Sequence, residues 1–247
     1  MALPVITGVT PTAPKVLIHG LSGVGKSTLA AKLKNPYFLD FEGGLNYIGC
    51  ARTPIIKNDV TFGLLISALL NEAASGKRTY DTVVIDSIDW CVRRFEEVAS
   101  GIVEYDNKGN QVHKDLKSTL NKANGGYGNG AAHFQTLIKT ELIPRLSMLN
   151  EAGYGICLIA HSERKSIMDA DGIDTDRIAP KIHDKVVDPF IEWADDVFYL
   201  KNENGERILV LEGDDNILAK NRQGLKGSVK LSEVDINELL TGGKKGK

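Results

Sequence analysis

The stretch Gly20-Leu21-Ser22-Gly23-Val24-Gly25-Lys26-Ser27 decides which fold the sequence predicts. It follows the apolar run 16–19 and leads into helical periodicity that continues to Leu33. Glycines at these positions allow backbone N–H groups to converge on phosphate oxygens where a strand turns into a helix. We therefore predict a phosphate-binding loop for a nucleotide such as ATP. In such a loop Lys26 reaches the β- and γ-phosphates, Ser27 ligates Mg²⁺ and Thr28 is a further nucleotide contact.

The composition is that of an ordinary globular protein. The chain has 247 residues, of which 42% are hydrophobic and 25% charged, and a formal net charge of −2. One α/β domain can be built from this length, and the charge balance excludes a disordered or uniformly basic chain. The three cysteines are scattered and lack the spacing of a zinc site or disulfide framework, which favours a reducing compartment. No apolar stretch approaches the length of a transmembrane helix, so we expect a cytoplasmic protein without a membrane partner.

Segments typical of strands and helices alternate along most of the chain. Apolar runs typical of buried strands lie at 16–19, 37–41, 82–86 and 155–160. Helical spacing lies at 26–33, 64–74, 87–103 and 134–152, the last with a kink expected at Pro144. Antiparallel strands are expected near 196–200, 207–212 and 217–220. The predicted fold class is α/β: a mostly parallel twisted sheet flanked by helices, with C-terminal antiparallel strands.

The chain divides into three parts on these grounds. We assign an N-terminal extension to 1–14, a nucleotide-binding domain to 15–231, and a C-terminal helix with a basic tail to 232–247. Within the domain, residues 106–131 are rich in Asn, Gly and Lys and poor in apolar side chains, which predicts a long mobile insert. Residues 162–180 are also polar and turn-rich, which predicts a second loop.

Two acidic residues at strand ends are candidates for the chemistry of this site. Asp86 closes the apolar run 83–85, and its carboxylate would hold Mg²⁺ directly or through water. Glu42 follows the strand at 37–41 and could orient or deprotonate an attacking water. A solvated turn carboxylate is the alternative interpretation, and position alone does not separate the two. Asp89 is interpreted as an acid in the first turn of a helix.

Polar and cationic residues elsewhere in the chain are further candidates for site residues. His161 ends the fourth strand, where it could bind a γ-phosphate or have only a structural role. Lys220 and Arg222 point to the same side of an extended segment and could neutralise γ-phosphate charge on a neighbouring subunit, or form a solvated basic turn. Cations in the two loops suit single-stranded DNA, but acidic residues dilute their charge and plain solvated loops fit equally well. These cations are Lys108, Lys114, Lys117, Lys122, Arg164, Lys165, Arg177 and Lys181.

Taken together, the motifs resemble the phage-type RecA-like P-loop ATPases. These are phage nucleotide-binding proteins of the AAA/RecA superfamily, and some of them are single-strand annealing or recombination proteins. The resemblance covers roughly residues 15–230 and rests on an ordered series of short matches. They are the phosphate loop, 38–44 (FLDFEGG), 84–87 (VIDS), 159–162 (IAHS), 176–177 (DR), 180–181 (PK), 192–195 (EWAD) and 220–224 (KNRQG).

The resemblance implies a RecA-like core for 15–231 and DNA-dependent ATP hydrolysis with Mg²⁺. It puts Glu42 at the catalytic glutamate position, His161 at the γ-phosphate sensor position, and 162–180 at the second DNA-binding loop. Lys220 and Arg222 resemble paired basic fingers that enter an adjacent subunit's site, so a homo-oligomeric ring or filament is implied. The implied function is annealing or homologous recombination of phage DNA in the host cytoplasm, with a single-stranded-DNA-binding protein as a further partner.

Three other functions share such a phosphate loop. A small-molecule kinase usually closes an Arg-rich lid, whereas residues 162–185 hold only Arg164 and Arg177. A GTPase switch needs a guanine-reading Asn-Lys-x-Asp motif, whereas the similar run 121–124 (NKAN) ends in Asn and lies in a polar loop. In the third alternative, an ATP-dependent module recruits a protein partner through the two loops and does not bind DNA.

Overall fold

The computed structural model describes residues 7–8, 12–105, 111–113, 115, 117–168 and 174–241. Its centre is a nine-stranded sheet with the order β11-β10-β9-β1-β7-β4-β2-β3, in which β8 pairs with β7 outside this path. The strands are β1 (Lys15–Gly20), β2 (Pro36–Asp40), β3 (Ala51–Arg52), β4 (Thr82–Asp86), β7 (Gly155–Met168), β8 (Asp174–Pro180), β9 (Asp196–Glu203), β10 (Glu206–Val210) and β11 (Ser228–Lys230). A separate two-stranded sheet consists of β5 (Val103–Tyr105) and β6 (Gln111–His113).

The inner strands run parallel to one another. β1 pairs in parallel with both β7 and β9, β4 joins β7 to β2, and β2 joins β3. The additions are antiparallel, because β10 and β11 extend the edge beyond β9 and β8 returns along β7. The predicted fold class, a mostly parallel sheet with C-terminal antiparallel strands, is confirmed.

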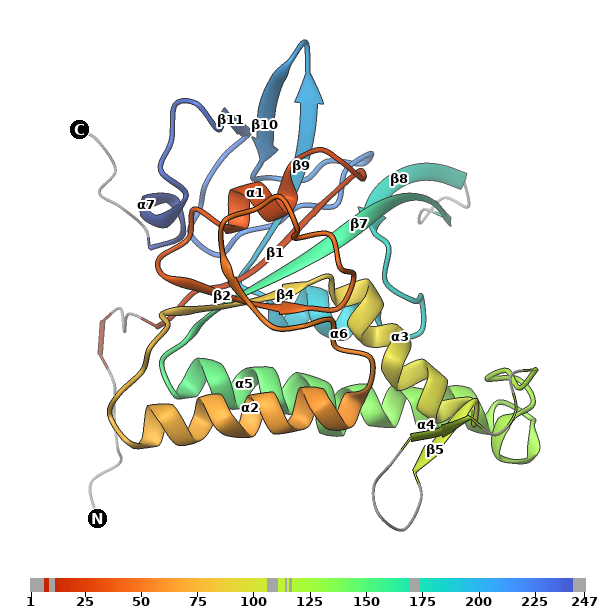
Figure 1. Ribbon diagram of the computed structural model, residues 1–247. Coiled ribbons are helices and arrows are strands. Elements are labelled where there is room, and N and C mark those ends of the chain that lie inside the picture. Colours follow the sequence, from red (N-terminus) through yellow and green to blue (C-terminus); the bar gives the residue numbers. More distant parts are fainter. Residues whose placement is uncertain are drawn as a thin grey trace.

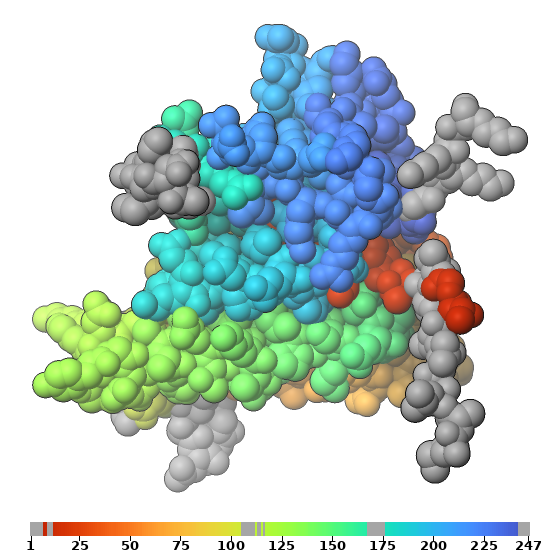
Figure 2. Space-filling model, turned by 180° about the vertical axis from the view of Figure 1, so that it is seen from behind, coloured from red at the N-terminus to blue at the C-terminus, as the bar shows by residue number. Residues whose placement is uncertain are grey.

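Helices cover both faces of the sheet (Figure 1). They are α1 (Lys26–Ala30), α2 (Asp59–Ala74), α3 (Ile88–Ala99), α4 (Asn129–Leu137), α5 (Ile143–Glu151), α6 (Val187–Trp193) and α7 (Ile236–Leu240). Successive residues of β1 face opposite layers: Leu17 packs in the cluster formed with α2 to α6, whereas Val16 and Ile18 pack with α1 and α7. Burial on both faces explains why the inner strands are continuous apolar runs. Seen from behind, α6 lies between the α4–α5 layer and the C-terminal elements (Figure 2).

Helices α4 and α5 are joined by a π-helical turn, η2 (Ile138–Leu142). Pro144 lies in the first turn of α5 and has no N–H to donate to the preceding turn. A π-turn accommodates that missing bond within one helical rod. The sequence predicted one helix with its kink at Pro144, and the irregularity lies in the turn before the proline.

Other helix boundaries differ from the predicted ones. α1 ends at Ala30, three residues before the predicted end at Leu33. α3 ends at Ala99 instead of Val103, because Gly101 adopts a φ of 71° that ends the helix and lets β5 begin. α2 begins earlier than predicted, where the side chain of Asn58 accepts a hydrogen bond from an N–H of the first turn. Within the described ranges, none of the helices is long and apolar enough to span a bilayer.

Both predicted loops contain regular structure. The range 106–131 includes β6, a 3₁₀ turn η1 (Ala123–Gly125) and the first residues of α4. The described part of 162–180 is a hairpin, in which β7 continues past His161 and pairs with β8. A hairpin that leaves the sheet needs no buried apolar face, so its residues can be polar. This polar composition led to the prediction of a loop. The strand predicted at 217–220 is reduced to two isolated bridges, and β11 forms the sheet edge instead.

Candidate active site

The phosphate loop joins β1 to α1. Gly23 and Gly25 have φ values of 76° and 103°, a region that glycine enters without steric cost. Nζ of Lys26 donates hydrogen bonds to the backbone oxygens of Gly20 and Leu21, both at 3.0 Å. Burial lowers the pKa of Lys26, and nearby carboxylates oppose this shift. Lys26, the side chain predicted to contact the β- and γ-phosphates, is thus hydrogen-bonded to the backbone of the loop itself.

Asp86 lies at the end of β4, next to Ser27 of the loop. Asp86 is 5% exposed, and its carboxylate accepts a hydrogen bond from the side chain of Ser27. Burial raises its pKa to about 6; the charges of Glu42 and Asp40 add to this, and Ser27 and Lys26 oppose it. A hydroxyl and a carboxylate in contact are the hard oxygen donors that suit Mg²⁺ alongside phosphate oxygens. Ser27 and Asp86 are therefore the residues that would hold the metal.

Glu42 is positioned by a turn at the end of β2. Oδ1 of Asp40 accepts hydrogen bonds from the backbone N–H of Glu42 at 3.1 Å and of Gly43 at 2.6 Å. The N–H of Phe41 donates to the backbone oxygen of Asp86 at 2.7 Å, which ties this turn to the end of β4. Asp40 is a positioning residue that the sequence analysis did not single out, although an Asp two residues before a turn is a recognisable signal for such bonds.

His161 is brought to the same edge because β7 lies between β1 and β4. It is paired in register with Gly20, the first residue of the loop motif. Its Nδ1 lies 2.9 Å from Oδ2 of Asp89, and its Nε2 lies 3.6 Å from Oε1 of Glu42. The bond to Asp89 raises the pKa of His161. Asp89 does lie in the first turn of α3, but it also holds the imidazole, which no local pattern could reveal.

His19, directly before the loop, is a second histidine that the sequence analysis missed. It is 0% exposed; its Nδ1 lies 2.9 Å from the hydroxyl of Ser162 and its Nε2 lies 2.7 Å from the backbone oxygen of Leu218. This network assigns a neutral ring, in which Nε2–H donates to the carbonyl and Nδ1 accepts from the hydroxyl. Burial lowers the pKa of His19 to about 4. The ring connects the phosphate-loop strand to the base of the β7–β8 hairpin.

A protein-family model described as an AAA domain matches residues 12–223. The chain belongs to this family. Membership identifies a P-loop NTPase, in agreement with the loop at Gly20–Ser27. The AAA domain is also similar to the SPbeta prophage-derived uncharacterized protein YorG of Bacillus subtilis (strain 168), with 24% identity over 222 residues. The match covers 89% of this chain and 56% of the relative, so the chain spans little more than half of that protein's length.

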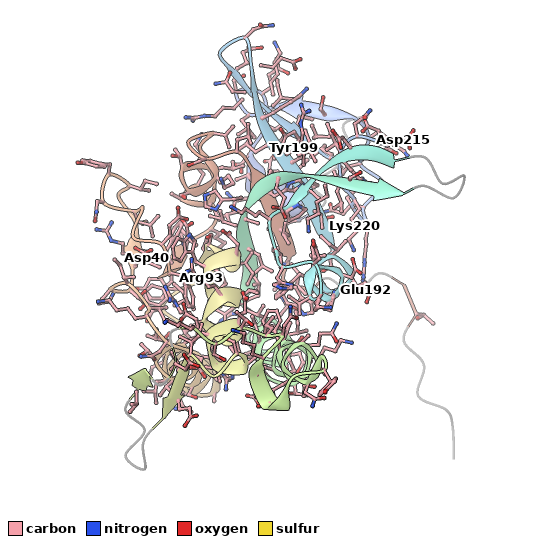
Figure 3. All side chains as sticks on the ribbon, turned by 90° about the vertical axis from the view of Figure 1, so that its right-hand side faces the viewer. Asp40, Arg93, Glu192, Tyr199, Asp215 and Lys220 are labelled. Carbon is pink, nitrogen blue, oxygen red and sulfur yellow. The ribbon has the colours of Figure 1, made fainter. Side chains whose placement is uncertain are left out.

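Lys220 and Arg222 lie away from the active site of their own AAA domain. Lys220 is bridged to the second residue of β9, and Arg222 pairs with Asp195 at 3.2 Å. The N–H of Asp195 in turn donates to the backbone oxygen of Lys15, at the amino end of β1. Figure 3 shows Asp40 on one side of the molecule and Lys220 on the other. Within one subunit these two cations therefore do not join the carboxylates of the site.

The structure separates the cations predicted to contact DNA. Lys108 and Lys114 lie outside the described residues. Exposed cations near η1 and cations of the β7–β8 hairpin lie toward opposite ends of α3, which contacts both β5 and β7 (Figure 1). The first group is Lys117 and Lys122, and the second is Arg164, Lys165 and Arg177, with Lys181 directly after the hairpin. Lys165 and Arg177 are directly opposite in the hairpin, but Lys165 is paired with Asp184 and Glu163, so part of its charge is neutralised.

A groove of about 340 Å³ runs beside α3 and reaches His161. Trp90 and Arg93 contribute from α3, and Lys181 and His183 from the segment after β8. The guanidinium of Arg93 lies 5.3 Å from the centroid of the Trp90 ring. We call it the α3 groove. Trp90 and Arg93 were not among the predicted site residues, although their spacing of three residues predicts a shared helix face.

Proposed function

We propose that this AAA domain is a Mg²⁺-dependent ATPase that binds single-stranded DNA as an oligomer and promotes annealing or homologous recombination of phage DNA. The ATPase part rests on one observation: Lys26, Asp86, Glu42 and His161 meet at the carboxyl edge of the sheet. In open α/β sheets this edge is where ligands bind. In that order, the four side chains supply a cation that pairs with the phosphates, a metal ligand, a general base and a polar contact.

Each side chain has a defined part in hydrolysis. Lys26 carries the charge that pairs with the phosphates once its Nζ leaves the backbone oxygens of the loop. Mg²⁺ held by Ser27 and Asp86 would neutralise phosphate charge. Glu42 orients a water and accepts its proton as the water oxygen bonds to the γ-phosphorus and the bond to the leaving ADP oxygen breaks. Asp89 raises the pKa of His161, whose imidazole lies beside Glu42; in its protonated form the ring would stabilise negative charge on the phosphoryl group.

The α3 groove supports the DNA part of the proposal. A tryptophan with Arg93 and Lys181 nearby suits a single strand, because bases stack on the ring and phosphates pair with the cations. His161 lines this groove and also faces Glu42. A strand bound there would change the surroundings of the histidine and hence of the base. This gives a direct route by which DNA stimulates hydrolysis.

The assembly and the phage setting have separate support. Lys220 lies on the side of the molecule opposite Asp40 (Figure 3), as a head-to-tail assembly requires if one subunit completes the site of the next. The similarity to a prophage-derived protein supports a phage origin and, with it, action in the host cytoplasm.

The deciding experiment is ATP hydrolysis with Mg²⁺, with and without a single-stranded oligonucleotide. We expect turnover to rise on addition of the strand, and the oligonucleotide to shift on a gel at low salt with ATP present. Arg93→Ala should reduce the stimulation and leave basal turnover in place. Lys230→Ala, which removes a cation at the far edge of the sheet, is the matched control. An ATP hydrolysis rate that does not change on addition of DNA, together with no gel shift, would refute the DNA part of the proposal.

A small-molecule kinase is the second candidate, favoured by the same groove. Its volume of about 340 Å³ matches a small acceptor, and it opens beside His161 at the terminal-phosphate side of the site. A phosphorylated small molecule formed in the assay, with turnover that ignores DNA, would establish this alternative.

A further inference from the structure

A second groove, of about 400 Å³, adjoins the phosphate loop on its other side. One wall is Gly25 of the loop with Thr28 and Lys32 of the segment that follows. The β9–β10 hairpin lines the groove through Asn202 and Arg207, and Ser232 also contributes to the lining. We call it the hairpin groove. None of the motifs in the sequence pointed to it.

The strand order decides which part of a nucleotide faces this groove. β1, which carries the loop, has β7 on one side and β9 on the other. Asp86 and Glu42 belong to β4 and the end of β2, beyond β7. A triphosphate whose terminal group lies toward these carboxylates must extend its other end over Gly25 and Thr28. That direction leads to β9 and β10, and thus into the hairpin groove.

Arg207 is the side chain best placed to contact the part of the nucleotide that extends beyond the phosphate loop. A Cβ added to Gly25 would lie 2.9 Å from Cζ of Arg207, so the guanidinium packs directly on the α-carbon of the loop. Arg207 is an exposed residue. A guanidinium presents a flat face for stacking on a base and five N–H donors, which a lysine does not offer. Thr28 and Asn202 add short polar groups of the kind that bind ribose hydroxyls.

We infer that the hairpin groove binds the nucleoside half of the nucleotide, the base and ribose, and that Arg207 contacts the base. This inference rests on the proposed ATP site, since the phosphate loop sets the position of the triphosphate. It assigns the β9–β10 hairpin, which the hydrolytic site does not use, to nucleotide recognition. Arg207 acts on affinity and on discrimination of the base, and has no part in cleaving the phosphate bond.

The test compares Mg·ATP with Mg·tripolyphosphate, which has the phosphates but no nucleoside. Arg207→Ala should weaken ATP binding about tenfold, which is the loss expected when a cation stacked on an aromatic ring is removed. The affinity for tripolyphosphate should stay unchanged. Ser232→Trp, which adds a bulky side chain to the lining of the groove, should have the same selective effect. Lys201→Ala is the matched control on the same hairpin; Lys201 pairs with Glu203 and should leave both affinities unchanged.

The outcomes separate this inference from the function on which it rests. If the unaltered protein binds ATP but both variants bind it equally well, the inference is wrong and the ATP site stands. An equal loss of ATP and tripolyphosphate affinity would also overturn it, because Arg207 would then act on phosphates. If the unaltered protein binds neither ligand, the proposed ATPase function fails and the inference fails with it.

Discussion

The Nδ1 atom of His161 lies 2.9 Å from Oδ2 of Asp89, and the backbone N–H of His161 donates to Oδ1 of the same carboxylate at 3.3 Å. This two-point contact joins the first turn of α3 to β7. It also fixes the plane of the imidazole, so that Nε2 faces Glu42 at 3.6 Å. The carboxylate raises the pKa of His161. The orientation and the charge of the ring therefore both depend on Asp89.

Asp89→Asn should shift the pH dependence of ATP hydrolysis. Loss of the carboxylate lowers the pKa of His161, so the imidazolium loses its proton at lower pH. The alkaline fall of kcat is expected to begin at lower pH than in the unaltered protein, and His161→Gln should remove that fall. The measurement is a set of kcat–pH profiles at saturating ATP. Superimposable alkaline limbs in all three proteins would show that this histidine carries no charge used in turnover.

Lys26→Ala and Glu42→Gln should fail at different steps. The alanine variant loses the cation that pairs with the phosphates and should bind ATP weakly. Glu42→Gln keeps the loop and should bind ATP normally, with kcat lower by about 10²- to 10⁴-fold, the usual contribution of a general base. Nucleotide binding and single-turnover hydrolysis, measured side by side, distinguish the two. Normal turnover by Glu42→Gln would remove Glu42 from the mechanism.

His19 and Asp86 should have opposite effects on stability in acid. The folded protein holds His19 with a pKa of about 4, below its ordinary 6.5, so the unfolded chain binds the proton first as the pH falls. Stability is then lost between pH 6.5 and 4, by up to about 3 kcal/mol. Asp86 has a folded pKa of about 6, above its ordinary 3.8, so the folded protein binds the proton first. The contribution of Asp86 to the free energy of unfolding therefore rises as the pH falls from 6 to 4, by a similar amount.

These two contributions nearly cancel in the unaltered protein, and single substitutions should expose each one. Asp86→Asn should become less stable as the pH falls from 6.5 to 4.5, whereas His19→Gln should become more stable relative to its own value at neutral pH. Urea unfolding at several pH values without nucleotide measures both slopes. Parallel pH dependence in the two variants would contradict the assigned pKa directions.

Arg222→Ala and Lys26→Ala subunits should complement each other if the basic pair acts on a neighbouring subunit. Each variant alone should be nearly inactive. A mixed oligomer contains sites where an intact Lys26 meets an intact Arg222 of the next subunit, so part of the ATPase activity should return on mixing. The measurement is turnover against mixing ratio. Activity that stays at the level of the separate variants would leave Arg222 with the role seen within one subunit, its ion pair with Asp195.

The sequence by itself determined the parts of this protein that depend on neighbours along the chain. The phosphate loop between Gly20 and Ser27, the buried strands and the acid at the end of β4 are local patterns, because backbone conformation and burial repeat over a few residues. The α/β class follows from their alternation. The hairpin beyond His161 escaped prediction because its strands pair outside the two-sided core, where polar residues are tolerated.

Only the tertiary structure decided how these parts meet. The order of strands puts β7 between β1 and β4, and this brings His161 between Asp89 and Glu42. The same order puts the groove lined by Arg207 on the side of β1 away from Asp86, and Lys220 lies on the side of the molecule opposite Asp40. Strand order and facing side chains are set by packing between segments far apart in the chain, so no local pattern in the sequence encodes them.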